Sequence, residues 1–207
     1  GAGLVTICAP ETIQGVVASF QPEVMTEGLP STEQGALAAS AVDPLLKVLV
    51  GKDAAAMGPG LGRHPETVEL VHSVVRQASV PLVLDADALN AFESAVDKLE
   101  NDHHQALIIT PHPGEFSRLV GLPTSEILPR RVELARQMAQ TKGIWVVLKS
   151  FRTLIAQPDG QVFTTALGNP GMATAGMGDV LTGTIAALVG IYCAQGMSEP
   201  DQISQAV

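Results

Sequence analysis

Aromatic residues are scarce in this chain of 207 residues, where Phe, Trp and Tyr together make up 3%. The 46% of apolar residues are therefore mostly Val, Leu, Ile and Ala, a composition that suits a parallel sheet buried between layers of helices. Basic residues are also few, with 12 Lys and Arg against 21 Asp and Glu and a formal net charge of −9. Because no basic patch can neutralise phosphates or anionic headgroups, we expect no nucleic-acid and no membrane partner.

Cysteine is nearly absent, since the chain has only Cys8 and Cys193, far apart and without metal-ligand spacing. We expect two buried thiols, with a single disulfide as the alternative, and hence a reducing, cytoplasmic compartment. No uninterrupted apolar run reaches the roughly 18 residues of a membrane-spanning helix, and no signal peptide is visible. No group of His, Cys, Asp or Glu has ligand spacing, so we predict no metal site built by the protein alone.

Short apolar runs alternate with amphipathic stretches, which is typical of a doubly wound, mostly parallel sheet with helices on both faces. We predict one domain over residues 1–207, with residues 20–40 as a surface loop or flap. The turn at residues 157–160 predicts an antiparallel hairpin at one edge. The predicted strands are residues 4–9, 53–57, 81–84, 106–110, 144–148, 153–156 and 161–165, and the predicted helices are residues 42–50, 65–77, 131–142 and 172–192.

Polar or glycine-rich turns follow successive predicted strands, at residues 58–62 (GPGLG), 85–90 (DADALN), 111–115 (PHPGE) and 149–153 (KSFRT). In open α/β sheets, ligands bind beyond the carboxyl ends of the strands. Each turn alone has a structural interpretation, because the aspartates in DADALN could cap the next helix and the lysine in KSFRT could be a solvated strand end. Taken together, these turns predict a binding site along that edge of the sheet.

Residues 168–183, GNPGMATAGMGDVLTG, place a glycine-dense loop directly before an apolar helix. Glycines let backbone N–H groups crowd around an anion, and the positive end of the helix dipole points at the same place. Asp179 stands at the junction, where it could be a helix cap or an acid/base group. The glycine density favours a phosphate-binding loop with an acid/base carboxylate at its rim.

These stretches resemble the ADP/ATP-dependent NAD(P)H-hydrate dehydratase family of the ribokinase-like superfamily. The matching stretches, in the expected order, are GAGLVT at 1–6, GPGLG at 58–62, LDADALN at 84–90, TPHPGE at 110–115, VVLKSFRT at 146–153 and GNPGMATAGMGDVLTG at 168–183. The combination of TPHPGE with NPGMAT is specific to the family, whereas the GD step marks the superfamily. The resemblance implies a three-layer α/β/α sandwich, mostly parallel, with an antiparallel edge hairpin.

The resemblance also implies a metabolite-repair reaction. The family restores NADH and NADPH that have been damaged by hydration of the nicotinamide ring, by dehydrating the S-epimer at the expense of ADP or ATP. Hydroxide is a poor leaving group, whereas a phosphorylated hydroxyl can be expelled by the lone pair of the ring nitrogen. We therefore expect a lyase with ADP or ATP as co-substrate and Mg²⁺ bound largely through phosphates and water. Family members assemble as homo-oligomers, and we expect a tetramer or a similar assembly.

Residue roles follow from the same resemblance. Asp179 corresponds to the family's acid/base aspartate, which also contacts the hydrated dinucleotide. The residues that correspond to the rest of the dinucleotide site are Gly62, His112, Pro113, Gly114 and Glu115, in a segment that runs on to Arg118. The residues that correspond to the nucleotide site are Lys149, Ser150, Phe151, Arg152, Thr153, Asn169, Pro170, Gly171, Met172, Ala173, Thr174, Ala175, Gly176, Met177 and Gly178.

The chain departs from the family pattern in three places. Ser150 stands where Gly is usual, and Met177 stands where Ser or Thr is usual. The family also has a strand, a glycine-rich turn and a helix before the GAGLVT stretch and a helical tail after Val207, so we expect a fragment of a longer protein. Two other functions stay open: a small-molecule kinase of the hydroxymethylpyrimidine or thiazole type, and a non-catalytic nucleotide-binding domain. The second is suggested by Met177, which lacks the hydroxyl that Ser or Thr would offer to the phosphates.

Overall fold

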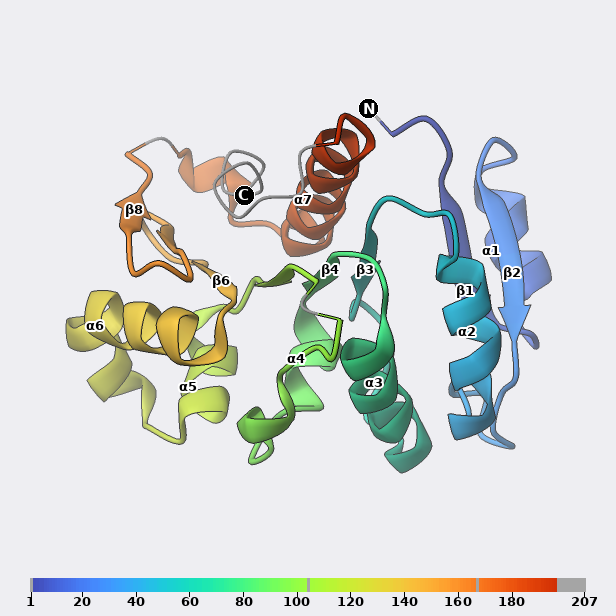
Figure 1. Cartoon of the computed structure of the whole chain (residues 1–207), viewed down its shortest axis with the longest axis horizontal. Coiled ribbons are helices and arrows are strands. Elements are labelled where there is room, and N and C mark those ends of the chain that lie inside the picture. Colours follow the sequence, from blue (N-terminus) through green and yellow to red (C-terminus); the bar gives the residue numbers. More distant parts are fainter. Residues whose placement is uncertain (1, 104, 167, 197–207) are drawn as a thin grey trace.

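A six-stranded sheet of order β3-β4-β5-β6-β7-β8 forms the centre of the fold (Figure 1). The structure, a computed structural model, describes residues 2–103, 105–166 and 168–196. The parallel strands are β3 (Ala55–Met57), β4 (Leu82–Leu84), β5 (Leu107–Ile109) and β6 (Trp145–Leu148). The antiparallel strands β7 (Leu154–Ala156) and β8 (Val162–Thr164) follow at one edge, which confirms the predicted hairpin.

Two layers of helices enclose this sheet, with α7 on one face and most of the other helices on the opposite face (Figure 1). The predicted three-layer α/β/α arrangement is thus confirmed. The helices are α1 (Gln14–Phe20), α2 (Val42–Leu49), α3 (Pro65–Gln77), α4 (Ala86–Asn90), α5 (Pro113–Val120), α6 (Thr124–Lys142) and α7 (Met177–Ala194), and short 3₁₀ turns are η1 (Ala39–Ala41), η2 (Val96–Lys98) and η3 (Pro170–Met172).

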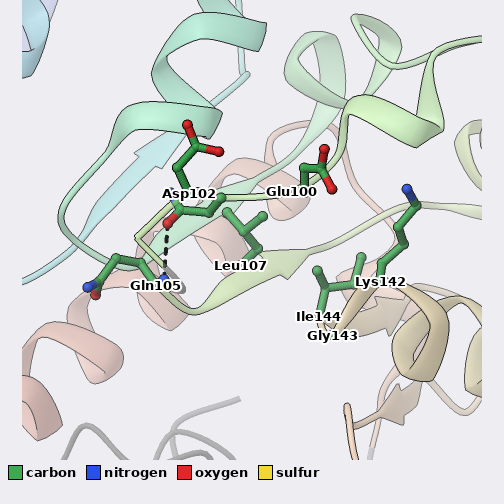
Figure 2. Close-up of a pocket in the computed structure, with 8 residues that line it drawn as sticks. Glu100, Asp102, Gln105, Leu107, Lys142, Gly143 and Ile144 are labelled. Atoms are coloured by element: carbon green, nitrogen blue, oxygen red, sulfur yellow. Dashed lines mark hydrogen bonds between the residues drawn. The ribbon is translucent and has the colours of Figure 1, made fainter.

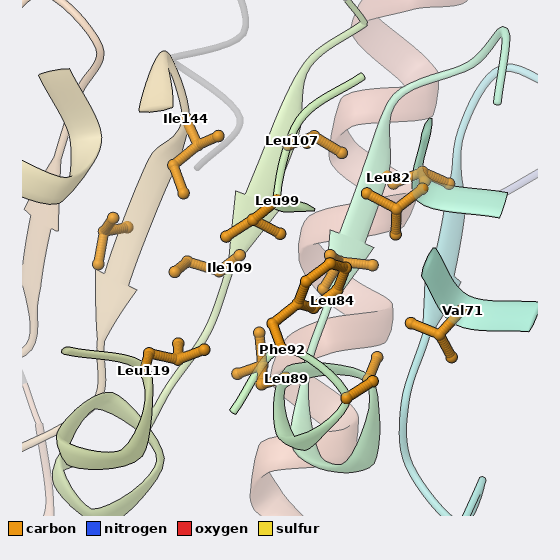
Figure 3. Packing of buried hydrophobic residues seen from close by; sticks show 14 of the residues in the cluster. Val71, Leu82, Leu84, Leu89, Phe92, Leu99, Leu107, Ile109, Leu119 and Ile144 are labelled. Carbon is orange, nitrogen blue, oxygen red and sulfur yellow. The ribbon is translucent and has the colours of Figure 1, made fainter. Parts of the chain in front are cut away.

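Side chains point alternately to the two faces of the buried strands and so form two separate hydrophobic cores. Leu82 and Leu84 point to the face covered by α3 to α6, where they join the largest core cluster (Figure 3). Val83, between them, points to the opposite face and packs in a second cluster with Ile185 of α7. Successive side chains of a strand point to opposite faces, so a strand buried on both faces reads as an unbroken apolar run. This is why these short strands were recognisable in the sequence.

The first part of the chain forms a separate two-stranded parallel sheet of β1 (Thr6–Pro10) and β2 (Met25–Leu29), connected by α1. The strand predicted over residues 4–9 is confirmed with shifted ends. The prediction of a loop over residues 20–40 is wrong for residues 25–29, because MTEGL carries too few β-branched residues to predict a strand. Backbone pairing with β1, rather than side-chain preference, makes this segment extended.

Two helix boundaries also differ from the prediction. The helix expected over 131–142 begins at Thr124 and continues through Pro129. The helix expected over 172–192 begins at Met177, because Gly176 has a φ of +83° and ends the preceding irregular segment. By length and mean hydropathy α7 could also cross a membrane. Its buried residues Thr182, Ile185 and Val189 lie against the sheet, whereas Val180 and Leu188 are exposed, so sheet packing covers only part of this apolar helix.

Candidate functional site

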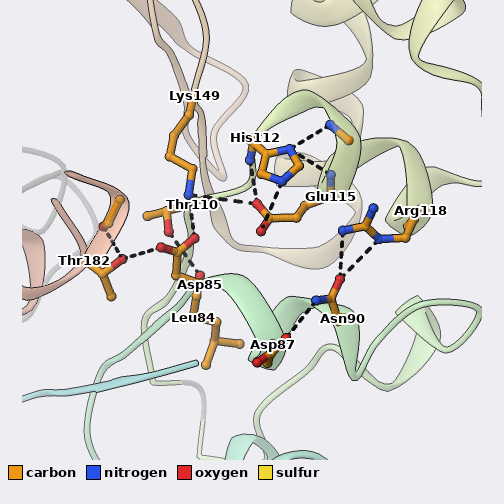
Figure 4. A network of polar contacts seen from close by, with 12 residues as sticks. Leu84, Asp85, Asp87, Asn90, Thr110, His112, Glu115, Arg118, Lys149 and Thr182 are labelled. Atoms are coloured by element: carbon orange, nitrogen blue, oxygen red, sulfur yellow. Dashed lines mark hydrogen bonds and ion pairs between the residues drawn. The ribbon is translucent and has the colours of Figure 1, made fainter. Parts of the chain in front are cut away.

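The carboxylate of Asp85 lies at the centre of a polar network at the carboxyl end of the sheet (Figure 4). Asp85 directly follows β4 and its side chain is 2% exposed. Its Oδ1 accepts a hydrogen bond of 2.6 Å from Nζ of Lys149, which directly follows β6. Its Oδ2 accepts a hydrogen bond of 2.8 Å from the hydroxyl of Thr182, in the second turn of α7. One buried carboxylate therefore connects two strands with α7.

Two glycines allow the backbone to pack closely around Asp85. Gly58, directly after β3, has a φ of +140°, and a Cβ there would lie 1.7 Å from the carbonyl oxygen of Asp85. Gly58 therefore cannot be replaced without moving the Asp85 backbone. A Cβ on Gly178 would lie 3.5 Å from both Asp85 Oδ2 and Lys149 Nζ. The first turn of α7 thus rests directly against the ion pair.

His112 and Glu115 form a capping box at the start of α5. Nδ1 of His112 accepts hydrogen bonds from the backbone N–H groups of Gly114, at 2.9 Å, and Glu115, at 3.3 Å. Oε2 of the buried Glu115 accepts a 2.7 Å hydrogen bond from the His112 N–H and lies 3.9 Å from Lys149 Nζ. Pro113 at the first helical position favours this start of the helix. The capping box leaves the His112 ring half-exposed at the edge of the network.

A second set of contacts ties the GPGLG turn to α4 and α5. The backbone N–H of Gly62 donates a 2.9 Å hydrogen bond to Oδ2 of Asp87. Asn90 donates to Oδ1 of Asp87 at 3.1 Å and accepts from Nε and Nη2 of Arg118 at 3.2 and 2.9 Å (Figure 4). Gly62 and Arg118, both assigned to the dinucleotide site from the sequence, therefore belong to one connected group. Asp87 and Asn90 join them.

The loop after β6 is shaped by its own backbone and by a residue of α6. Arg131 donates to the Ser150 hydroxyl at 3.0 Å and to the Phe151 carbonyl at 3.1 Å. Arg152 has a φ of +60°, and Thr153 donates to the Ser150 carbonyl at 3.4 Å. The Phe151 side chain is 86% exposed. The side chains of Phe151 and Arg152 thus lie on the surface of the loop, while Lys149 points inward to Asp85.

The glycine-dense segment before α7 lies on the surface and leads into a helix start without a side-chain cap. Asn169 accepts from the N–H of Gly171 at 2.8 Å and begins η3. Residues 170–176, which include Ala173, Thr174 and Ala175, are exposed. Gly176 at the N-cap of α7 makes no side-chain hydrogen bond to the helix. The Met177 N–H donates to the Thr174 carbonyl at 3.3 Å, whereas the N–H groups of Gly178 and Asp179 have no acceptor among the described residues and are available to an anion from outside.

Asp179 lies exposed in the first turn of α7. Within the described part of the chain, its carboxylate has no hydrogen-bond or ion-pair partner. The alternative that Asp179 only caps the helix is wrong, since the cap residue is Gly176 and no side-chain cap bond is formed. Met177, on the same turn, is half-buried.

The structure brings part of the predicted site together around Asp85. Lys149, Gly178, His112 and Glu115 all lie in or beside its network. The sequence assigned no role to Thr182, and it placed Asp85 in a turn of the predicted binding edge, with helix capping as the structural alternative. The capping alternative is wrong: Asp85 occupies the N-cap position of α4 but makes no cap hydrogen bond there. The charged residues that directly follow β4 and β6 were the available signal.

Both cysteines are free thiols within the described residues, which supports the expectation of thiols over the disulfide alternative, but both are half-buried rather than buried as expected. Burial, the largest cause, raises the pKa of Cys8 and of Cys193 above the ordinary value. Neither is therefore a reactive thiolate at neutral pH.

A hollow of about 520 Å³ lies at the opposite, amino end of β5 and β6 (Figure 2). Its wall mixes the charged residues Glu100, Asp102 and Lys142 with the apolar Leu107 and Ile144. None of the residues expected to bind a nucleotide or dinucleotide lines it. In α/β sheets of this kind ligands bind at the carboxyl end, so the candidate site is the Asp85 network and the start of α7.

Known proteins resemble this chain over most of its length. In Moorella thermoacetica, a protein named bifunctional NAD(P)H-hydrate repair enzyme Nnr is 50% identical over 190 residues, which are 92% of this chain and 36% of that protein. The chain thus spans about a third of that relative's length. In Neisseria meningitidis, a protein named ADP-dependent (S)-NAD(P)H-hydrate dehydratase is 37% identical over 135 residues, which are 64% of this chain and 46% of that protein.

A solved structure has the same fold. The ADP/ATP-dependent NAD(P)H-hydrate dehydratase from Bacillus subtilis, co-crystallized with ATP/Mg²⁺, superposes with a TM-score of 0.72 at 29% identity and covers 98% of this chain and 66% of its own. A family model described as NAD(P)H-hydrate dehydratase matches residues 1–200. The chain belongs to the NAD(P)H-hydrate dehydratase family, within the ribokinase-like fold.

Proposed function

We propose that this chain carries the dehydratase activity that converts the S-epimer of hydrated NADH or NADPH back to the reduced dinucleotide, using ADP or ATP. One observation carries the proposal: the uncapped start of α7 presents the carboxylate of Asp179, which has no partner among the described residues, beside the backbone N–H groups of Gly178 and Asp179. A phosphate held by those N–H groups would lie next to a base. This arrangement suits transfer of a phosphoryl group to an alcohol.

In the first step, the hydroxyl of the hydrated ring attacks the terminal phosphorus, and Asp179 accepts the hydroxyl proton. The bond between that phosphorus and the nucleotide breaks, so ADP leaves as AMP, or ATP as ADP. In the second step, the ring nitrogen lone pair expels the new phosphate and the neighbouring carbon loses a proton, which restores the ring double bond. No electrons are exchanged with an oxidant, and the net products are NAD(P)H, inorganic phosphate and the shorter nucleotide.

The nucleotide would lie between the 149–153 loop and the segment from Asn169 to Gly178. Both follow the carboxyl edge of the sheet, and both expose backbone rather than cationic side chains, except for Arg152. Lys149 is engaged by Asp85, so we assign its ammonium to the architecture of the site. Ser150 is held by Arg131, which offsets the loss of the usual glycine by fixing the turn.

Mg²⁺ would accompany the nucleotide and offset charge on the transferred phosphoryl group. Across residues 2–103, 105–166 and 168–196, no three His, Cys, Asp or Glu side chains gather to hold a metal ion. Asp179 offers one exposed carboxylate near the expected phosphates. One carboxylate without further protein ligands fits a Mg²⁺ ion that is coordinated mostly by phosphate oxygens and water.

The hydrated dinucleotide would lie against Gly62 and against the start of α5, formed by His112 and its neighbours. Contacts from Asp87 and Asn90 hold these two segments in one group with Arg118. The half-exposed His112 ring can meet a ligand from there, while its Nδ1 is used by the capping box.

The deciding experiment incubates the protein with hydrated NADH, Mg²⁺ and either ADP or ATP. Growth of the reduced-nicotinamide absorbance together with release of inorganic phosphate supports the dehydratase. A stable phosphorylated product would instead identify a small-molecule kinase. Comparison of ADP with ATP, and of NADH with NADPH hydrate, fixes the preferred substrates.

Asp179→Asn provides the sharpest test, because it removes the base and keeps the shape. We expect turnover to fall at least about 1,000-fold, with ADP affinity within a few-fold, since general-base and positioning effects are of that order. Asp43→Asn is the matched control, because Asp43 is also exposed in the first turn of a helix, α2. If the wild-type protein is inert and Asp179→Asn changes nothing, the non-catalytic alternative is correct.

We also propose a cytoplasmic location, a single ribokinase-like domain over residues 1–207 and a homo-oligomer such as a tetramer. Two free thiols with raised pKa values fit a reducing compartment. Size-exclusion chromatography with light scattering tests the oligomer.

A further inference from the structure

Asp85 connects three parts of the site that are far apart in the sequence. Its carboxylate follows β4, the Lys149 ammonium follows β6, and Thr182 belongs to α7. Thr182 is buried, and its hydroxyl lies 2.8 Å from Asp85 Oδ2 and 3.0 Å from the Gly178 carbonyl. The hydroxyl therefore links the buried carboxylate to the first turn of α7.

A stabilising role alone does not account for this arrangement. Asp85 and Lys149 have side chains that are 2% and 22% exposed, and taking such charges out of water offsets much of their attraction. Asp85 also occupies the N-cap position of α4 yet makes no cap bond there. Its carboxylate is directed instead toward Lys149 and α7.

The residue held by this contact is one turn from the proposed base. Thr182 lies three positions after Asp179, and Gly178, whose carbonyl Thr182 contacts, lies immediately before Asp179. Residues three apart in a helix are neighbours on its surface. A shift of Thr182 would therefore move both Asp179 and the N–H groups that are available to phosphate.

We propose that Asp85 is a positioning residue, which fixes the start of α7 through Thr182 while Lys149 holds the carboxylate in place from the β6 side. This inference rests on the proposed function, because it concerns the placement of Asp179. It assigns Asp85 and Thr182 no contact with either substrate. It predicts that their loss impairs the chemical step and leaves nucleotide binding largely intact.

Thr182→Val tests the link, because valine keeps the branched shape and removes the hydroxyl. We expect kcat to fall about 10- to 100-fold, the effect of a misplacement of about 1 Å, with the KM for ADP within about threefold. Asp85→Asn should act in the same direction. The double variant should lose little more than Asp85→Asn alone, since both changes weaken the contact between Asp85 and Thr182 and only Asp85→Asn also removes the ion pair with Lys149. Thr182→Ser should restore most of the rate.

Thr184→Val is a matched control from the same helix. The Thr184 hydroxyl donates at 2.8 Å to the carbonyl four residues earlier, as Thr182 does at 3.0 Å, but Thr184 is exposed and has no contact with Asp85. This control removes the same type of helix contact. We expect its kcat to stay within about twofold of wild type.

Amide hydrogen exchange at residues 180–182, whose N–H groups are the first to be bonded to carbonyls of the α7 start, gives a readout that needs no turnover. Thr182→Val and Asp85→Asn should speed exchange there at least about 10-fold, whereas Thr184→Val should not. Unchanged exchange, or a KM that rises as much as kcat falls, refutes the positioning role. If exchange accelerates as expected but the wild-type protein never forms NADH, the link is supported and the proposed function is refuted.

Discussion

Replacement of Gly58 by alanine should be among the most damaging single-methyl changes in this protein. The added Cβ would lie 1.7 Å from the Asp85 carbonyl oxygen, so one of the two backbones must move by roughly 2 Å to reach an ordinary contact. The φ of +140° at position 58 adds conformational strain once the residue is alanine. Overpacking and strain together suggest a loss of about 4 kcal/mol in the free energy of unfolding.

Gly60→Ala separates the clash from the strain. Gly60 belongs to the same turn and has a φ of +73°, but a Cβ there would meet nothing within 4 Å. We expect Gly60→Ala to cost about 1 kcal/mol. With a urea dependence of about 2 kcal/mol/M, the unfolding midpoint should fall by about 2 M for Gly58→Ala and about 0.5 M for Gly60→Ala. Equal midpoints for the two variants would refute the close approach of Gly58 to Asp85.

Two further predictions concern side chains away from the α7 contact. His112→Ala removes one half of a capping box, so we expect a loss of about 1 kcal/mol of stability and a larger loss of affinity for hydrated NADH than for ADP. The control is His64→Ala, which removes the N-cap acceptor of α3. It should lower the stability by a similar amount, and calorimetric titrations should show unchanged affinity for hydrated NADH and for ADP. Cys8 and Cys193 should alkylate more slowly than free cysteine at pH 8, because burial raises the pKa of both thiols. Their alkylation rates should increase as the pH rises toward those pKa values. If either residue reacts at pH 8 as fast as free cysteine, its pKa is not raised.

The sequence predicts the central sheet well because its strands are buried on both faces. The run at residues 144–148, which contains β6, is unbroken, apolar and bounded by Gly143 and Lys149, and no amphipathic helix has that pattern. The strand Met25–Leu29 has the opposite character. It lies in a two-stranded sheet with alternating exposure and contains glycine and glutamate, so only its pairing with β1 makes it a strand.

The polar network was harder to predict than the fold. Asp85 and Lys149 each stand directly after a buried strand, and this could be read from the sequence. That they form an ion pair depends on β5 lying between β4 and β6, a fact of sheet order. Thr182 gave no signal at all, because one threonine in an apolar helix is ordinary, and its partner is 97 positions away.

The charge of the site explains why the placement of α7 matters so much. Asp85 and Glu115 lie beside Lys149, whose ammonium is already paired with Asp85, and Asp179 adds an exposed carboxylate at the start of α7. In a chain with a net charge of −9, long-range attraction cannot concentrate the nucleotide there. What remains to bind phosphate is the backbone of the glycine-dense segment and the start of α7, where the helix dipole is equivalent to roughly half a positive charge. Such partial charges act only within the first turn, so a small displacement of α7 moves Asp179 and these N–H groups relative to the phosphoryl group that is transferred and slows the chemical step. An acidic protein that holds a polyanion through its backbone must therefore anchor that helix firmly, and the contact from Asp85 to Thr182 does so.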